Sequence, residues 1–314
     1  MITTPQPARI RTAGAHCDGY TPAPPTLTHR TREQDTFATA WTAIGERHFR
    51  VKVRLPHDHP FFAPVPGGIY DPLLIVETMR QSSIMVSHAA LRVPLEHHFM
   101  LLELEFACRP EYLRVGPGPA EMELDVLIPK IQYSAGLPSQ FQCDWILRRD
   151  AAVAATGTGR TRLATPHMYR RLREGRTLPP TRILPGPVLA PRTVGRQRAQ
   201  DVLLAPGDQP QQWPLALDTC HPTLFQRPND HIPGMLLLEA ARQAAGALHS
   251  PRPFVPSAGR ITFRQYAEFG SPCLIKAGTL PGAKERRTTR VQVGGVQDER
   301  AVFSCVLEAP AVMH

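Results

Sequence analysis

Two copies of the pattern Glu-x-x-Arg-Gln are the features of this sequence best suited to chemistry. The copies are Glu77, Arg80 and Gln81, then Glu239, Arg242 and Gln243. The spacing i, i+3, i+4 places the three side chains of each copy on one face of a helix. Each copy therefore presents a carboxylate, a guanidinium and an amide together.

Both copies lie in strongly apolar stretches, where charged side chains are costly unless they are paired or hydrogen-bonded. One interpretation is a structural Glu–Arg pair, which could also cross between the two helices. The other is a polar site cut into an apolar groove, where ligand pockets usually lie. In that case desolvation would raise the pKa of the glutamate and suit it to general base catalysis.

Histidines stand at matching positions in the loops ahead of the two patterns. His59 precedes Glu77 by 18 residues, and His221 precedes Glu239 by the same distance. We expect them to bind substrate, with a structural or solvent-facing role as the alternative. Cys220 is adjacent to His221, but adjacency alone is weak evidence for a thiolate nucleophile.

The loop before the second pattern carries further candidate binding groups. Arg227 and His231 lie near the expected start of a helix, and Gly234 and Met235 begin that helix. Backbone N–H groups at a helix start can receive an oxyanion or a phosphate. Close packing is the alternative explanation for Gly234.

An internal repeat contains all of these residues. Residues 59–81 align without a gap to residues 221–243, an offset of 162, and seven of the 23 positions are identical. A tandem duplication explains this match better than chance. The two patterns are therefore expected to occupy equivalent places in two similar halves.

The elements that position the patterns are long buried helices followed by strands. Asp71 is an expected N-cap with Pro72 at the first helical position, and Pro233-Gly234 opens the second helix. The residues that follow are apolar nearly all round, as in buried helices. Strands are predicted at residues 37–55, 99–106, 120–128, 141–147, 152–163, 202–217, 260–269, 273–277, 288–293 and 301–308. The fold class is therefore α+β, with each helix on an antiparallel sheet.

Length and proline distribution suggest the domain organisation. The chain has 314 residues and 34 prolines, enough for two ordinary domains. We expect a flexible Pro/Thr-rich tail at 1–27, repeats at 28–166 and 193–314, and a Pro/Arg-rich linker at 167–192. The run from Tyr169 to Arg173 is either solvated surface or a patch for phosphate or an acidic carrier protein.

Composition excludes several classes of protein. No secretory signal and no apolar run of about 18 residues is found, so no membrane span is expected. Six scattered cysteines indicate reduced thiols in a cytoplasmic protein without a metal site. The net charge of +9 comes without a nucleic-acid-binding motif, and an acidic carrier protein or a phosphorylated substrate fits it as well as nucleic acid does. We expect no nucleic-acid partner.

Several segments, taken in order, resemble the A-factor biosynthesis family of tandem hotdog proteins. They are DPLLIVETMRQ at 71–81, the segment 88–99 with Val93-Pro94, Tyr169 to Arg173, DHIPGMLLLEAARQA from Asp230, and FRQYAEFGSP at 263–272. The Pro-Gly pair before a helix also resembles hotdog acyl-carrier-protein dehydratases. The resemblance covers about residues 28–310 and implies a tandem double hotdog.

The resemblance also implies a reaction. Enzymes of this family transfer a β-ketoacyl group from an acyl carrier protein to the hydroxyl of dihydroxyacetone phosphate. The ester leads to γ-butyrolactone, butenolide or furan signals that control antibiotic production. No cofactor or metal is implied. Gly195 and Arg227 depart from the family, which usually has histidine at both places.

Site residues follow from the same resemblance. Glu77 would assist deprotonation of the attacking hydroxyl, and Arg242 would hold the phosphate or the thioester carbonyl. Because hotdog pairs build sites between subunits, we predict a composite catalytic site of Glu77, Arg242 and Glu239. The predicted substrate-binding residues are Arg80, Gln81, Gln243, His59, His221, Arg227, His231, Gly234 and Met235.

Two other functions stay open. A hotdog thioesterase or dehydratase would act on similar acyl thioesters without the acceptor. A non-catalytic acyl-binding regulator would bind the ligand without turnover.

Overall fold

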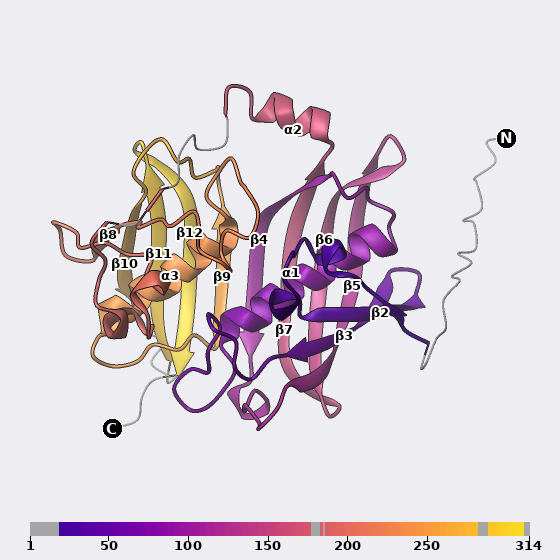
Figure 1. The fold of residues 1–314 in the computed structure, drawn as a ribbon, viewed down its shortest axis with the longest axis horizontal. Coiled ribbons are helices and arrows are strands. Elements are labelled where there is room, and N and C mark those ends of the chain that lie inside the picture. Colours follow the sequence, from indigo (N-terminus) through magenta and orange to yellow (C-terminus); the bar gives the residue numbers. More distant parts are fainter. Residues whose placement is uncertain (1–18, 177–182, 185, 282–287, 311–314) are drawn as a thin grey trace.

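One continuous antiparallel sheet with two long helices against it forms the body of the molecule (Figure 1). The structure is a computed structural model that describes residues 19–176, 183–184, 186–281 and 288–310. In this part of the chain the sheet has twelve strands, in the order β1-β2-β3-β5-β6-β7-β4-β9-β12-β11-β10-β8. The expected α+β arrangement, with a long helix on an antiparallel sheet in each half, is confirmed.

The first half contributes seven strands and helix α1. The elements are β1 Thr21–Pro22, β2 Ala38–Gly45, β3 His48–Leu55, α1 Pro72–Ala89, β4 His98–Cys108, β5 Ala120–Ser134, β6 Leu137–Arg149 and β7 Ala152–Ala164. Short 3-10 helices lie at Pro25–Thr28 (η1), Glu33–Asp35 (η2) and Pro110–Tyr112 (η3).

The second half contributes five strands and helix α3. Its elements are β8 Gln212–Pro214, α3 Gly234–His249, β9 Ala258–Phe263, β10 Leu274–Leu280, β11 Thr288–Gln297 and β12 Arg300–Pro310, with 3-10 helices η4 Pro191–Val194 and η5 Ala199–Asp201. Helix α2, Pro166–Leu172, stands between the halves.

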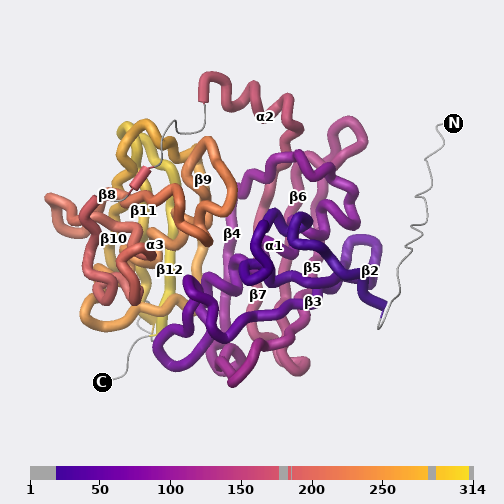
Figure 2. Tube along the Cα trace, viewed as in Figure 1, coloured from indigo at the N-terminus to yellow at the C-terminus, as the bar shows by residue number. Residues whose placement is uncertain are grey.

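Strands β4 and β9 join the halves into one sheet. They pair antiparallel from Glu103 opposite Thr262 to Ala107 opposite Ala258. The trace in Figure 2 shows the two halves side by side, the first in indigo to magenta and the second in orange to yellow. This pairing joins the two repeats in one continuous sheet.

Helix α1 is buried almost all round, and its sequence explains why this is tolerated. The Asp71 carboxylate accepts the backbone N–H of Leu73 at 2.8 Å and caps the helix start. The buried hydroxyls of Thr78, Ser82 and Ser87 donate to carbonyls one turn earlier. These three hydroxyls are therefore satisfied within the helix itself.

Several local predictions differ from the structure. The strand predicted at 37–55 is the hairpin of β2 and β3. Residues 19–27, expected as part of a flexible tail, include β1, which pairs with β2, and most of η1. The predicted linker begins as helix α2, capped by Thr165 with Pro166 at its first position. The strand predicted at 202–217 is reduced to β8, because Pro206 and Pro210, which precede it, remove ladder donors.

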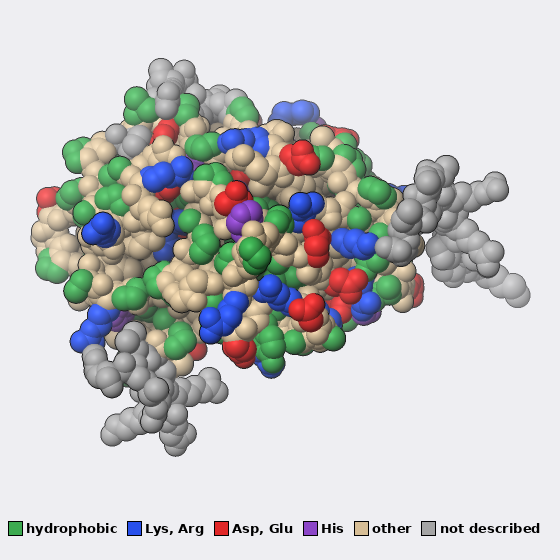
Figure 3. Space-filling model, turned by 60° about the horizontal axis from the view of Figure 1, so that its bottom comes forward, with side chains coloured by type: hydrophobic (Ala, Val, Ile, Leu, Met, Phe, Trp, Pro, Cys, Tyr) green, Lys and Arg blue, Asp and Glu red, His purple; other side chains and the backbone are tan. Residues whose placement is uncertain are grey.

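Two further predictions concern membranes and cysteines. Among the described residues, no helix is both long and apolar enough to cross a membrane. Acidic and basic side chains are interspersed over the face shown in Figure 3. The five described cysteines are free thiols, as expected, while Cys17 lies outside the described residues.

A glycine in β7 leaves room for the core tryptophan. A Cβ atom at Gly159 would lie 2.4 Å from Cη2 of Trp145, whereas one at Gly278 in β10 would meet nothing within 4 Å. We therefore expect Gly159→Ala to lower the free energy of unfolding by about 1–3 kcal/mol through overpacking. Gly278→Ala, the matched control, should be neutral or slightly stabilising. Urea unfolding of both variants checks this, and equal stabilities would contradict the packing argument.

Candidate active site

The first polar pattern forms a buried ionic cluster, here called the first centre: Arg30, Glu77, Arg80 and Gln81. Arg80 donates Nε to Oε2 of Glu77 and Nη2 to Oε1, both at 2.8 Å. Arg30 donates Nε to Oε1 at 3.0 Å and a second bond from Nη2, and Gln81 donates at 2.9 Å. The Glu77 side chain is 1% exposed. One carboxylate thus holds two guanidiniums and an amide.

The second pattern forms a matching cluster, the second centre: Arg196, Glu239, Arg242 and Gln243. Arg242 donates to both oxygens of Glu239 at 2.8 and 2.6 Å. Arg196 donates Nε to Oε1 at 2.9 Å, and Gln243 donates at 2.6 Å. Asp71 adds a second carboxylate, with its Oδ2 3.8 Å from Nη1 of Arg196.

Each centre is completed by a loop from the other half. Nη1 of Arg30 donates to the carbonyl of Thr223 at 3.3 Å, and Nη1 of Arg196 donates to the carbonyl of Phe61 at 2.5 Å. The Phe61 ring packs edge-on against His221, with centroids 5.0 Å apart. The expectation that the repeats lend residues to each other therefore agrees with these contacts.

His59 and His221 shape those loops. Nδ1 of His59 accepts the backbone N–H groups of Phe61 and Phe62 at 3.1 and 3.0 Å, so it carries no proton. Its Nε2 then donates to Asp35 at 3.0 Å. His221 repeats this arrangement with Thr223, Leu224 and Asp201. Both ring nitrogens of each histidine are occupied, so these side chains position loops and have no nitrogen free for substrate.

Gln81 and Gln243 also have occupied amides. The Gln81 amide donates to the carbonyl of Asp35 at 2.8 Å, and its oxygen accepts the N–H of Phe37 at 2.8 Å. Gln243 makes the equivalent bonds to Asp201 at 2.7 Å and Leu203 at 2.8 Å. Each glutamine fixes the segment that carries the arginine of its centre.

The buried glutamates are ionised, which corrects the expectation of a raised pKa. Burial by itself raises the pKa of Glu77, but the charges and hydrogen bonds of Arg30 and Arg80 outweigh it and lower the pKa to about 2. Arg196 and Arg242 do the same for Glu239, also to about 2. These carboxylates therefore orient guanidiniums more readily than they accept protons.

Arg242 belongs to the second centre. Burial opposes its charge, but Glu239 raises its pKa. Among the hydrogen bonds and ion pairs of the described residues, none joins Glu77 to Arg242. What the second half brings to Glu77 is the loop of Thr223, Gln226 and Arg227. Oxygen Oε1 of Gln226 accepts the N–H of Thr31 at 3.4 Å.

A histidine pair lies beside the first centre. Nδ1 of His88 lies 2.7 Å from the carbonyl of Val93 and must donate to it, because a carbonyl only accepts. Burial lowers the pKa of His88, so its neutral Nε2 accepts from Nε2 of His29 at 2.8 Å. Burial and Arg227 lower the pKa of His29 to about 2. Neutral His29 is therefore left with an unprotonated Nδ1.

The loop before α3 is held by α2. The Tyr169 hydroxyl donates to Asp230 at 2.8 Å, and Nδ1 of His231 lies 2.7 Å from the same oxygen. Arg173 pairs with Asp230 at 2.9 Å and with Glu268 at 2.7 Å. Tyr169 and Arg173 are thus buried structural residues, not solvated surface.

The start of α3 favours the packing interpretation of Gly234. A Cβ atom there would lie 3.1 Å from the ring of Phe263. Met235 is half-buried, and the helix start has no side-chain cap.

Sequence reasoning did not assign Arg30, Arg196, Asp35 or Asp201 to the site. A second self-match contains the signal: Arg-x-Arg-x-Gln-Asp occurs at 30–35 and at 196–201, an offset of 166. This short match has an offset of 166, whereas the longer repeat has an offset of 162, so an alignment without gaps does not contain both. That match identifies Arg30, which contacts Glu77, and Arg196, which contacts Glu239.

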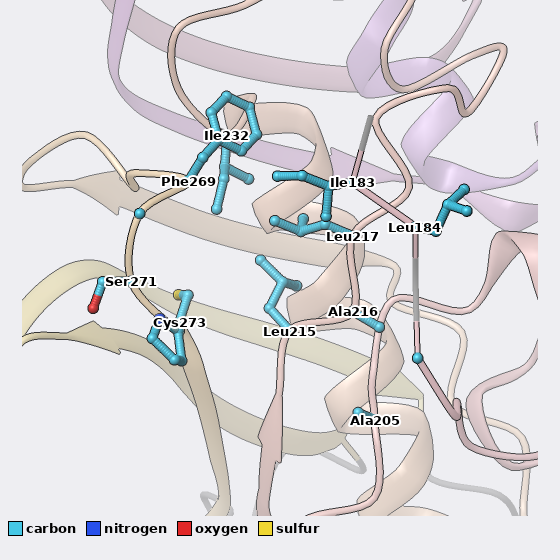
Figure 4. Close-up of a pocket in the computed structure, with 13 residues that line it drawn as sticks. Ile183, Leu184, Ala205, Leu215, Ala216, Leu217, Ile232, Phe269, Ser271 and Cys273 are labelled. Carbon is cyan, nitrogen blue, oxygen red and sulfur yellow. The ribbon is translucent and has the colours of Figure 1, made fainter. Parts of the chain in front are cut away.

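A pocket of about 340 Å³ lies apart from both centres (Figure 4). It belongs to the second half, and Ile183, Leu215 and Leu217 line it together with Ile232 and Phe269. None of its lining residues is in either centre. In the described part of the chain, no three His, Cys, Asp or Glu side chains are grouped to hold a metal ion.

Glu77 should make stability depend on pH in acid. Its folded pKa of about 2 lies below the ordinary 4.5, so its stabilising contribution is complete above pH 4.5 and is lost as the pH falls towards 2. We expect Glu77→Gln to lower the free energy of unfolding at pH 7 by about 3–5 kcal/mol, since it leaves buried guanidiniums without their carboxylate.

Urea unfolding between pH 2 and 7 measures this. The difference between wild type and Glu77→Gln should shrink below pH 4.5. Glu121→Gln is the control, because this glutamate is 67% exposed and 3.7 Å from Arg54, so its loss should cost less than about 1 kcal/mol. A difference that stays constant with pH would refute the low pKa.

Comparison with solved structures identifies the architecture. An oleoyl thioesterase from Lactobacillus plantarum superposes with a TM-score of 0.55 at 9% identity, covering 85% of this chain and 97% of its own. A hot dog fold protein of unknown function from Alicyclobacillus acidocaldarius gives 0.51 at 15% identity, covering 90% and 99%. At these identities the likeness shows the fold alone.

Comparison with sequences identifies the family. A protein of Streptomyces coelicolor named 2-oxo-3-(phosphooxy)propyl 3-oxoalkanoate synthase is 50% identical over 292 residues, 92% of each chain. Proteins of the same name from Streptomyces griseus and Streptomyces virginiae are 47% and 40% identical, covering 90% of this chain and 94% and 96% of their own. The model of the A-factor biosynthesis hotdog domain matches residues 15–165 and 185–312. The chain therefore belongs to the A-factor biosynthesis hotdog family.

Proposed function

We propose that the chain is an acyltransferase that forms a 2-oxo-3-(phosphooxy)propyl 3-oxoalkanoate. It would move a 3-oxoacyl group from an acyl carrier protein thioester to the hydroxyl of dihydroxyacetone phosphate. The ester would lead to a γ-butyrolactone, butenolide or furan signal. Relatives of that name match over nine-tenths of the chain. The observation that carries the proposal is a buried, cationic centre built by both repeats around Glu77.

The reaction needs no covalent intermediate on the protein. The acceptor oxygen forms a bond to the thioester carbon, the carbon–sulfur bond breaks, and the hydroxyl proton ends on the released thiol. Catalysis then depends on positioning both substrates and on stabilising the oxyanion. The guanidiniums of Arg30 and Arg80, fixed by Glu77, can supply this charge.

The geometry favours different roles for the two predicted catalytic glutamates. Glu77 orients the arginines that face the substrate, and Glu239 with Arg242 holds the second centre together. The proton of the acceptor hydroxyl would pass to the free Nδ1 of His29, which lies beside Arg30 in the chain. Burial lowers the pKa of His29 most, and Arg227 and Arg80 lower it further, so a phosphate bound nearby would offset only the part that the arginines contribute.

Mass spectrometry of the purified protein with a 3-oxoacyl thioester, with and without dihydroxyacetone phosphate, tests the function. We expect a phosphorylated ester, or its dehydrated butenolide, only when the acceptor is present. Free 3-oxo acid formed regardless of acceptor would indicate a thioesterase, and an enoyl product a dehydratase. Tight binding without turnover would indicate a binding protein, and each of these three results overturns the proposal.

Variants in the same assay test the residues. Glu77→Ala, Arg242→Ala and His29→Ala should each lower the rate, and circular dichroism should show which remain folded. His29→Ala is expected to lower kcat with little change in the KM for the acceptor. Full activity in both Glu77→Ala and Arg242→Ala would refute their roles, and an unchanged kcat in His29→Ala would refute the base.

We further propose that the carrier protein docks on the outer face of α2. Met168 and Leu172 are 56% and 59% exposed there, beside exposed Arg170 and Arg171. The inner face is fixed, since Tyr169 stacks on His98 with centroids 3.6 Å apart. An apolar patch beside two arginines that make no ion pair with any described residue complements an acidic carrier protein. The loop of Asp230 that α2 holds leads to Arg227 and the first centre.

Replacing both Arg170 and Arg171 by glutamate tests this surface. The KM for a carrier-protein thioester should rise about tenfold or more, because two attractive charges become repulsive. The KM for a small thioester of N-acetylcysteamine should not change. Arg47→Glu with Arg109→Glu, two exposed arginines elsewhere, is the matched control. An equal rise for both donors, or an equal effect of the control pair, would contradict docking on α2.

A further inference from the structure

The two centres have the same core but different charge around it. In the second centre, two carboxylates, Glu239 and Asp71, stand against Arg196 and Arg242. In the first centre, Glu77 alone stands against Arg30 and Arg80, with Arg227 close by. By formal charge the second centre is neutral and the first carries two positive charges in excess.

Arg227 is placed at the first centre by its loop. Thr223 and Gln226 of this loop are hydrogen-bonded to Arg30 and Thr31. Burial and the charges of Arg80 and Arg30 lower the pKa of Arg227. Among the described residues its guanidinium has no hydrogen bond and no ion pair. Arg227 therefore adds a third guanidinium close to Arg30 and Arg80, in a centre with one carboxylate, an arrangement that needs a further anion.

The sequence repeat shows that this asymmetry comes from two positions. With the offset of 162, Arg227 aligns with Val65, so the first-half loop brings no third arginine to the second centre. Asp71 aligns with Pro233, so the first centre has no second carboxylate. Both differences make the first centre more cationic.

The second centre is also closed. The side chains of Arg196 and Arg242 are 6% and 5% exposed, whereas those of Arg30 and Arg80 are 11% and 23% exposed. The Arg196 guanidinium lies 4.1 Å over the Phe61 ring. A Cβ atom at Gly195, the counterpart of His29, would lie 3.3 Å from Nη1 of Arg242. The second centre has neither the room nor the charge for an anionic ligand.

We propose that the phosphate of the acceptor binds at the first centre between Arg80 and Arg227, and that the second centre is a closed structural counterpart. That the phosphate belongs to an acyl acceptor rests on the proposed function. The binding itself rests on the charge and exposure of the first centre. One phosphate dianion balances the two excess positive charges and gives Arg227 the partner that it lacks.

Calorimetric titration of the full chain without acyl donor tests the site. The probes are inorganic phosphate, dihydroxyacetone phosphate and dihydroxyacetone. We expect one phosphate or dihydroxyacetone phosphate per chain, weakened by salt, and no binding of dihydroxyacetone in the same range. Arg227→Gln should weaken both phosphate ligands by about tenfold or more, as expected for loss of a charge-assisted contact.

The control separates a binding role from a structural one. Arg109→Gln removes one exposed charge elsewhere and should leave phosphate affinity unchanged. In phosphate-free buffer, Arg227→Gln should unfold at the same temperature as wild type or higher, since it relieves repulsion from Arg80 and Arg30. A lower unfolding temperature would assign Arg227 a structural role and overturn the proposal.

The outcomes also distinguish this inference from the proposed function. If Arg227→Gln binds phosphate normally while wild type makes the ester, the site assignment fails and the function stands. If wild type binds phosphate through Arg227 but forms no ester, the site stands and the function fails. Two phosphates per chain would overturn the closed second centre.

Discussion

This structure depends on a glutamate buried inside an apolar helix, whose carboxylate accepts hydrogen bonds from an arginine and a glutamine of its own helix and from one arginine outside that helix. An isolated carboxylate in that position would be strongly destabilised. Glu77 and Glu239 are instead ionised, because each accepts bonds from an i+3 arginine of its own helix and from Arg30 or Arg196. The segments before β2 and β8 are thereby fixed against the helices.

Those same segments tie the halves to one another. Arg30 of the first half donates to the carbonyl of Thr223 in a loop of the second half. Arg196 of the second half donates to the carbonyl of Phe61 in a loop of the first half. Each loop is shaped by a histidine that bonds an aspartate of its own half, His59 with Asp35 and His221 with Asp201. Removal of one charge would therefore disturb a helix, a loop and the interface between repeats together.

Duplication explains the common core, and divergence explains the difference in exposure and charge. The Glu-x-x-Arg-Gln pattern and its aspartate–histidine support are the same in both halves. Val65 against Arg227, Pro233 against Asp71 and Gly195 against His29 distinguish them. All three differences lie in loops or at a helix start, where side chains change without disturbing the sheet. The second centre is closed and neutral, and the first is more exposed and cationic.

The sequence by itself determined the helices, most strands, the repeat and the family resemblance. These follow from periodicity, from capping residues such as Asp71, and from motifs with fixed spacing, all of which act locally. It also identified Glu77, Arg80, Glu239 and Arg242 as unusual charges in apolar surroundings. The strand at 202–217 was wrong in extent because prolines outweighed its apolar pattern.

Only the tertiary structure decided which groups meet. Arg30 and Glu77 are 47 residues apart, and Arg30 and Thr223 are 193 apart, so no local pattern could pair them. The pKa of Glu77 depended on that pairing: burial alone raises it, while two converging guanidiniums lower it. The assignment of Arg242 to the second centre, and of His59 and His221 to loop support, likewise required the geometry. Charge interactions and hydrogen bonds depend on the distance between two groups in space, and this distance cannot be read from their separation along the chain.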